Sequence, residues 1–187
     1  MSETISQKAA LRRVILAERD ALSAEYRARC ASALAGKASS TALRTLLPPP
    51  GAIIAGYWPI RSEMDPRPLM QALRAAGYRI ALPRILGEEL AFHLWEDGKA
   101  PVAGPFGTRE PAPDWPEAAP DLFLTPLAAF DAEGQRLGYG RGFYDRAFAQ
   151  WPAAKRVGLA FAAQKVAEVP TEAHDARLDL VLTGEAS

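Results

Sequence analysis

The chain has 187 residues with 22 basic and 22 acidic side chains, which is the size of one ordinary domain without net charge. This balance argues against a surface made for nucleic acid or an anionic membrane. One cysteine and two histidines exclude an internal disulfide framework and the common zinc spacings. No apolar run reaches the roughly 20 residues of a bilayer span, and the first residues lack a signal-peptide layout. We therefore expect a cytoplasmic monomer that acts on small molecules, with no nucleic-acid or membrane partner.

The N-terminal region predicts two helices. Apolar residues follow helical spacing over residues 8–22, with charges on the remaining faces. Ser23 is typical of an N-cap, and the second helical region ends at a run of prolines that begins at Pro48.

A β-α-β unit follows. Residues 52–58 form a short apolar run between turn residues, typical of a strand buried on both faces. Asp65 and Pro66 favour a helix start, and Gly77 favours its end. Residues 78–82 are then predicted as the next strand.

The second half continues the alternation of strands and helices. A helix is predicted over 143–151, and the proline-rich segment 99–120 is predicted as a surface loop. This alternation predicts an α/β fold with three layers (α/β/α) and a mainly parallel sheet, as a single domain over residues 1–187. Ligands of such folds bind beyond the carboxyl ends of the strands. The further predicted strands are 90–95, 122–127, 157–161 and 178–183.

The densest chemical pattern lies in residues 130–146, which read FDAEGQRLGYGRGFYDR. Three alternate glycines and two arginines come directly before the predicted helix. Glycines let backbone N–H groups turn toward an anion, and arginines add charged donors. The segment matches neither standard phosphate motif, since Phe143 stands where a dinucleotide fingerprint needs its third glycine. The pattern indicates a phosphate site, with a glycine-rich surface loop bearing solvated arginines as the alternative.

This segment resembles the signature of the 5-formyltetrahydrofolate cyclo-ligase family, also called methenyltetrahydrofolate synthetases. The likeness extends over nearly the whole chain. It departs from the family at Phe143, where Tyr is usual, and at Arg141, where Gly or Lys is common. The segments that carry it are 8–12, 58–65, 106–107, 110–111, 126, 130–131, 136–146, 160–164, 169–170, 174–175 and 178–179.

The resemblance implies a ligase of folate one-carbon metabolism that uses ATP as co-substrate and Mg²⁺ as cofactor. It implies ring closure of 5-formyltetrahydrofolate to 5,10-methenyltetrahydrofolate, with release of ADP and phosphate. In the family's mechanism the formyl oxygen takes the γ-phosphoryl group, and N10 then closes on the activated carbon. Such a site needs cations, oriented N–H groups and carboxylates for the metal.

The resemblance also implies an ATP site in which Arg136 and Arg141 are catalytic cations. Lys8 and Arg12 are four residues apart and so share a helix face; their alternative is a solvated face. We expect Arg136 to be exposed and to contribute little to stability. The residues implied for ATP are Lys8, Arg12, Arg136, Leu137, Gly138, Tyr139, Gly140, Arg141, Gly142, Phe143 and Tyr144.

Trp58, Glu63 and Tyr144 are the residues implied for the folate. Glu63 follows a predicted buried strand, where ligands dock, whereas Trp58 and Tyr144 could equally be core aromatics. Asp145 and Asp179 match the family's Mg²⁺ positions, and two carboxylates suffice for Mg²⁺ beside phosphates. The alternatives are a helix-start charge for Asp145 and a strand-end salt bridge for Asp179.

Other readings remain open at this point. His174 and Asp175 are predicted in a turn rather than in a metal site. The same architecture suits a phosphosugar isomerase or an acyl-CoA transferase, although the sequence offers few candidates for their base or nucleophile. A nucleotide- or folate-binding regulatory domain without turnover is the third reading, since architecture alone does not fix function.

Overall fold

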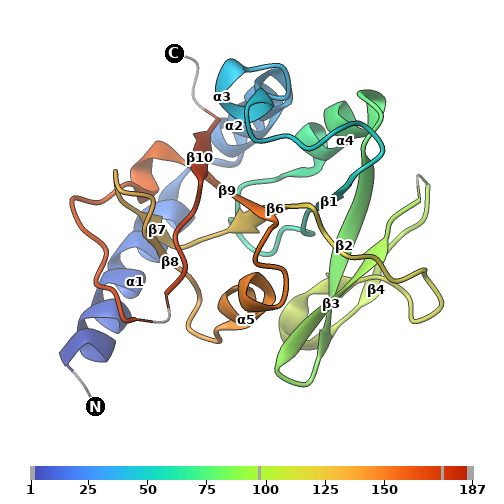
Figure 1. Ribbon diagram of the computed structural model, residues 1–187. Helices are drawn as coiled ribbons and strands as arrows, with labels where there is room; N and C mark the ends of the chain where they lie inside the picture. The colour runs from blue at the N-terminus through green and yellow to red at the C-terminus, as the bar shows by residue number, and fades with distance from the viewer. Residues whose placement is uncertain (1–2, 97, 174, 185–187) are drawn as a thin grey trace.

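The computed structural model describes residues 3–96, 98–173 and 175–184, and its centre is a six-stranded sheet (Figure 1). The strands are β1 (Ile53–Ala55), β2 (Arg79–Leu86), β3 (Glu89–Leu94), β6 (Leu122–Pro126), β9 (Lys155–Ala160) and β10 (Leu180–Thr183). Their order is β10-β9-β6-β1-β2-β3. The pairs from β10 to β2 are parallel, and β3 runs antiparallel to β2. The prediction of a mainly parallel sheet is confirmed.

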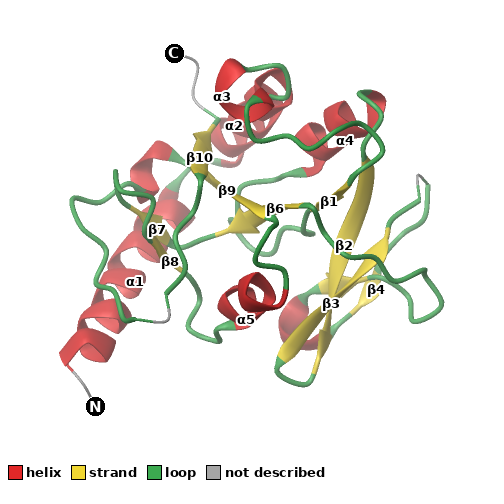
Figure 2. Ribbon diagram, in the orientation of Figure 1, coloured by secondary structure: helices red, strands yellow, loops and turns green. Residues whose placement is uncertain are grey.

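Helices cover both faces of this sheet (Figure 2). One face carries α2 (Ala24–Lys37), α3 (Thr41–Arg44) and α4 (Arg67–Ala75), and the other carries α5 (Phe143–Gln150). The apolar side chains of α2, α3 and α4 form one buried cluster with the sheet, and those of α5 form a second. The predicted three-layer α/β/α arrangement is therefore confirmed.

Local signals explain where the helices begin and end. Ser23 Oγ accepts a hydrogen bond of 3.1 Å from the Tyr26 N–H and caps α2 as predicted. Helix α4 begins at Arg67, whose N–H donates to Asp65 Oδ1 at 2.9 Å. Gly77 follows α4 with φ of 93°, a conformation that favours glycine.

Helix α1 (Glu3–Ala21) lies to one side of these layers, along a hairpin made by β7 (Ala129–Phe130) and β8 (Arg136–Leu137) (Figure 1). Ile15 packs against Leu137 and the neighbouring alanines of the hairpin. The hairpin follows directly on β6, so α1 lies at the carboxyl-end edge of the sheet. Among the described helices, none is long and apolar enough to cross a membrane.

Two regions differ from the predictions. The predicted strand 78–82 continues to Leu86, because from Pro83 onward β2 pairs with β3 rather than with β1. The proline-rich segment 99–120 is not entirely loop, since it contains a small hairpin that packs near β2. The elements of this segment are β4 (Val102–Ala103), the 3-10 turn η1 (Pro105–Gly107) and β5 (Arg109–Glu110).

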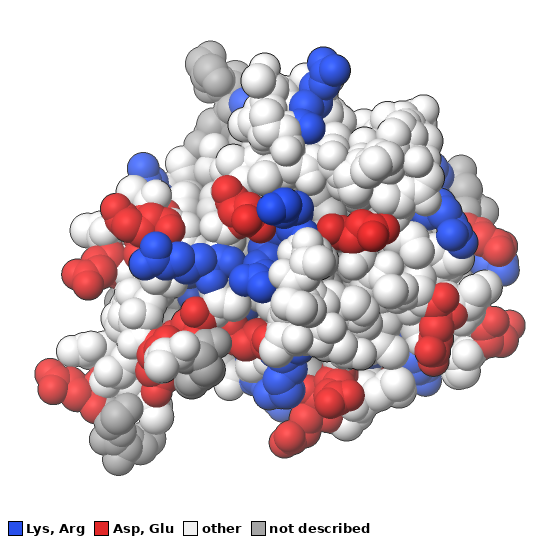
Figure 3. All heavy atoms as spheres, viewed as in Figure 1, with Lys and Arg blue, Asp and Glu red and all other residues white. Residues whose placement is uncertain are grey.

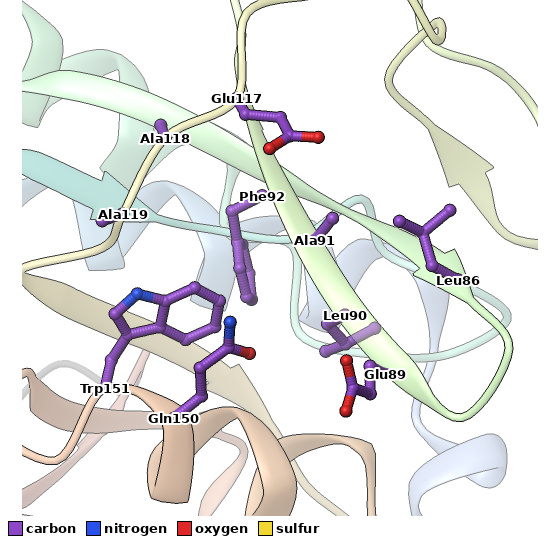
Figure 4. Close-up of a pocket in the computed structure, with 10 residues that line it drawn as sticks. All are labelled: Leu86, Glu89, Leu90, Ala91, Phe92, Glu117, Ala118, Ala119, Gln150 and Trp151. Carbon is purple, nitrogen blue, oxygen red and sulfur yellow. The ribbon is translucent and has the colours of Figure 1, made fainter.

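A hollow of about 450 Å³ opens between β3, residues 117–119 and the end of α5 (Figure 4). The rings of Phe92 and Trp151 line it, together with the carboxylates of Glu89 and Glu117. It contains none of the side chains that the sequence implies for phosphate or folate. The candidate site is instead built around the glycine-rich segment.

Candidate active site

Residues 138–142, called here the glycine loop, connect β8 to α5. Gly140 has φ of 88° and Gly142 has φ of 67°, both in the left-handed region that favours glycine. Gly142 is the N-cap of α5 and offers no side chain to its first N–H groups. A Cβ at Gly140 would lie 3.4 Å from Arg12 Cζ, which is an ordinary contact, so the positive φ rather than lack of space favours glycine here.

Two basic side chains of α1 reach this edge of the sheet. Lys8 Nζ donates to Glu172 Oε2 at 2.8 Å and to Asp175 Oδ2 at 2.5 Å. Burial lowers the pKa of Lys8, but the two carboxylates outweigh it and the net shift is upward. Arg12 Nε donates to the Gly138 carbonyl at 2.8 Å. The predicted pair thus contacts the rest of the site rather than forming a solvated face.

Arg136 is buried, and the expectation that it is exposed is wrong. Only 7% of its surface is accessible, because its guanidinium packs 4.8 Å from the ring centroid of Phe148. Its NH2 nitrogen donates to Asp145 Oδ1 at 2.7 Å. Burial lowers the pKa of Arg136, and Asp145 opposes this shift. Its Nε is buried and has no hydrogen-bond partner among the described residues.

The cations of this region are therefore balanced by carboxylates. Figure 3 shows basic and acidic side chains next to each other over the part of the surface near α1 and β8. Asp145 also lies 3.5 Å from the Ala176 N–H, and Asp175 raises the pKa of Arg136. An anion that enters this site must compete with these internal partners.

Glu63 lies beyond β1, with 8% of its surface exposed. Its Oε2 accepts a hydrogen bond of 2.9 Å from the Ile60 N–H. Burial raises the pKa of Glu63, while the Ile60 N–H and the Tyr139 hydroxyl oppose the shift. Glu63 in turn helps to raise the pKa of Tyr144, after burial, which is the larger cause. The structure thus brings Glu63 and Tyr144 together with the glycine loop.

Trp58 has other partners. Its ring makes an edge contact with Trp95 at 5.8 Å between centroids, and Arg67 Cζ lies 5.0 Å from its centroid. The half-buried ring packs against the core on the side of α2 and α4. The contacts that the structure gives Trp58 are thus core contacts and do not include Glu63 or Tyr144.

Asp145 and Asp179 have separate partners. Asp179 is exposed, and its Oδ2 accepts from the Arg156 N–H at 2.8 Å where β9 and β10 begin. Asp121 makes the same contact where β6 and β1 begin, with Oδ2 accepting from the Ile53 N–H at 2.8 Å. Asp179 therefore has a strand-end role, but through a hydrogen bond to a backbone N–H rather than through the salt bridge considered from the sequence.

The remaining loop residues have varied surroundings. Arg141 is exposed and stacks on Phe106 of η1, and Arg146 Cζ lies 5.5 Å from the ring centroid of Phe143. Leu137, which immediately precedes the glycine loop, is buried against α1 and so anchors the start of the loop. His174 lies outside the described residues.

Comparison with known proteins identifies the family of this chain. The sequence model of the 5-formyltetrahydrofolate cyclo-ligase family matches residues 4–184. The chain belongs to this family. A cyclo-ligase of Mycolicibacterium smegmatis is 32% identical over 94% of this chain and 93% of its own. That of Escherichia coli K12 is 35% identical over 70% of this chain and 76% of its own.

Solved structures of this cyclo-ligase family share the fold. The 5,10-methenyltetrahydrofolate synthetase of Aquifex aeolicus superposes with a TM-score of 0.79 at 29% identity, covering 96% of this chain and 90% of its own. That of Mycoplasma pneumoniae gives a TM-score of 0.71 at 28% identity, covering 95% and 99%. The family resemblance read from the sequence is confirmed, and with it the expectation of an enzyme.

Sequence reasoning missed one buried residue of this cyclo-ligase site. Arg19 of α1 is 2% exposed and contacts both Ser62 and Tyr139. It lies eleven residues after Lys8 and seven after Arg12, which are helical spacings for one face. Extending the Lys8–Arg12 pattern along the helix was the signal that could have found it.

Proposed function

We propose that this protein catalyses the ATP- and Mg²⁺-dependent cyclisation of 5-formyltetrahydrofolate to 5,10-methenyltetrahydrofolate, releasing ADP and phosphate. The observation that carries the proposal is the convergence of Arg12 and the buried Arg136 on the glycine loop, next to the buried Glu63 and Tyr144. Membership of the cyclo-ligase family supports the same reaction.

Lys8, Arg12 and the glycine loop bind the nucleotide phosphates in this proposal. Lys8 exchanges its carboxylates for phosphate oxygens, and the N–H groups of the loop and of the first turn of α5 donate to the same anion. Arg136 turns its guanidinium toward the γ-phosphoryl group, exchanging Asp145 for the phosphate. Arg141, on the outer side of the loop, supplies the second catalytic cation.

Asp145 and Asp179 are proposed to hold Mg²⁺. Among the described residues, no group of three acidic, histidine or cysteine side chains is arranged to hold a metal by itself. Asp145, beside the glycine loop, suits an ion that takes its other ligands from phosphate and water, as Mg²⁺ does. Asp179 lies at the amino ends of β9 and β10, whereas the glycine loop follows the carboxyl end of β6, so its part in the same site needs movement of one of these segments. Bound Mg²⁺ would neutralise charge on the phosphates during transfer.

At the folate end, Glu63 accepts hydrogen bonds from the pterin, and Tyr144 and Trp58 contact the substrate. The formyl oxygen attacks the γ-phosphorus, the bond to the ADP oxygen breaks, and Arg136 stabilises the transferring group. N10 then attacks the activated carbon and loses its proton, and the carbon–oxygen bond breaks to release phosphate. The buried surroundings of Glu63 limit competing hydrolysis by water.

We further propose that the enzyme acts in the cytoplasm as a monomer on these two small molecules. Light scattering of the purified chain, with and without Mg-ATP, tests the monomeric state. A mass of about two chains at assay concentration would overturn it.

The decisive assay mixes the protein with 5-formyltetrahydrofolate, Mg²⁺ and ATP, and follows the near-ultraviolet absorbance of the methenyl product together with ADP. We expect one ADP for each methenyl group, because the formyl oxygen must be phosphorylated before ring closure. Product formation at full rate with a non-hydrolysable ATP analogue would overturn the mechanism. Binding of both ligands without turnover would favour the regulatory-domain alternative.

A further inference from the structure

Arg19 connects two segments of the site that are far apart in the sequence. Its Nε donates to Ser62 Oγ at 2.9 Å, and its NH1 donates to the Tyr139 hydroxyl at 2.5 Å. Ser62 immediately precedes Glu63, and Tyr139 lies in the glycine loop. A single buried side chain of α1 thus holds both segments.

The chemistry of these groups orients the Tyr139 hydroxyl. A guanidinium can only donate, so the Tyr139 oxygen must accept from Arg19. The hydroxyl proton is then available to Glu63, with which Tyr139 interacts. Ser62 accepts from Arg19 in the same way and donates its own proton to Asp20 Oδ1. The direction of each bond is therefore fixed by the arginine.

This hydrogen-bond network reaches both proposed subsites. The Tyr139 ring is 37% exposed beside the nucleotide loop, while its hydroxyl points inward to Arg19. Glu63 is the group proposed to meet the folate. A ligand that orders the loop also orders the Tyr139 hydroxyl, and through it the Glu63 carboxylate. The first ligand has then already paid part of the entropy cost of ordering these side chains, so the second ligand binds more tightly.

We propose that Arg19 is a positioning residue that couples the glycine loop to Glu63, so that the nucleotide and the folate each strengthen the binding of the other. This inference rests on the proposed function, because it assumes that the two ligands occupy these two subsites. Coupling of this kind is reciprocal, and typical couplings change affinity by about 5-fold to 150-fold.

Calorimetry of 5-formyltetrahydrofolate binding, with and without a non-hydrolysable ATP analogue and Mg²⁺, measures the coupling. We expect the analogue to tighten folate binding by about fivefold or more in the parent protein. Tyr139→Phe removes only the hydroxyl, and Arg19→Lys keeps the charge but loses the two-pronged geometry. In both variants we expect the folate affinity measured with the analogue to approach the folate affinity measured without it, so that their ratio approaches one.

Arg13→Lys is the matched control, since Arg13 is an exposed arginine of the same helix. It should keep the parent's ratio. A purely structural role for Arg19 predicts a lower melting temperature in Arg19→Lys but an unchanged ratio in both variants, and that result overturns the inference. The absence of coupling in the parent overturns it as well.

Activity assays on the same proteins distinguish a failure of this inference from a failure of the proposed function. If the parent binds both ligands with coupling but forms no methenyl product, the proposed reaction fails and the role of Arg19 stands. If the parent turns over and both variants retain full coupling, the reaction stands and the role of Arg19 fails. Should Arg19→Lys not fold, Tyr139→Phe decides the question alone, because its ring remains in place.

Discussion

The guanidinium of Arg141 lies over the ring of Phe106, with Cζ 3.7 Å from the ring centroid. Phe106 is 59% exposed and has φ of 58°, a left-handed conformation that is costly for a residue with a side chain. The contact holds the turn between β4 and β5 against the glycine loop. The proline-rich segment thus reaches the proposed nucleotide site and holds one of its cations.

Phe106→Ala should raise the KM for ATP by about two- to fivefold, because an exposed cation–π contact contributes about 0.5–1 kcal/mol. The kcat should change less, since the ring does not touch the transferring group. Phe106→Tyr keeps the aromatic face and should behave like the parent. Steady-state kinetics at saturating folate measures both constants, and an unchanged KM in Phe106→Ala would show that the stacking does not position Arg141.

Arg136→Ala should reduce kcat/KM by about 100-fold or more, because it removes a fixed cation from the transferring phosphoryl group. It should also destabilise the fold by about 1–3 kcal/mol, since Asp145 loses its partner in a partly buried site. Turnover assays and chemical denaturation measure the two effects.

Adding Asp145→Ala to Arg136→Ala separates these effects. The double variant has no unpaired carboxylate and should recover part of the lost stability, yet it should remain inactive. Normal turnover in the single variant would instead assign Arg136 a purely structural role.

Asp145→Asn and Asp179→Asn should each raise the Mg²⁺ concentration needed for half-maximal activity by about tenfold or more, because each removes charge from a hard-cation site. High Mg²⁺ should partly restore the rate. Titration of activity with Mg²⁺ at fixed ATP gives the comparison.

Asp121→Asn is the matched control for Asp179→Asn, since both carboxylates accept from a backbone N–H near the start of a neighbouring strand. Asparagine keeps an acceptor oxygen, so both variants should fold. If Asp179→Asn has the same Mg²⁺ requirement as Asp121→Asn, the role of Asp179 is confined to the strand end.

Glu63→Gln should stabilise the protein at neutral pH and impair it as an enzyme. Burial raises the pKa of Glu63 above its unfolded value of about 4.3, so the folded state holds this proton to higher pH than the unfolded state. The stability that Glu63 contributes is therefore lost as pH rises from its unfolded pKa through its raised folded pKa. The glutamine should add about 0.5–2 kcal/mol at pH 7.

Thermal melts at a series of pH values check the sign. The advantage of Glu63→Gln should disappear below about pH 4, where the glutamate is protonated in both states. Folate affinity should fall by about tenfold or more through loss of a charged acceptor. A variant less stable than the parent at neutral pH would mean that the ionised Glu63 is stabilised by its surroundings.

The layers and the glycine loop were predictable because their signals are local. The cap at Ser23 and the apolar runs of the strands are readable from neighbouring residues. The start of α4 was predicted to within a residue or two, although its N-cap is Pro66 and Asp65 lies just before it. The burial of Arg136 was not, because it depends on Phe148 of α5 and on how that helix packs against the sheet. The contacts of Trp58 and Arg19 likewise depend on residues distant in sequence.

The contact of Lys8 with Glu172 and Asp175 joins residues separated by 164 and 167 positions. On a ribosome, α1 emerges first, and the segment that completes its ion pairs emerges roughly 10–30 s later at ordinary rates of synthesis. Until Leu137 and Tyr139 emerge, Ile15 and Arg19 also lack the surface against which they pack. A nascent chain therefore cannot assemble the complete Lys8 cluster until Asp175 has left the ribosome.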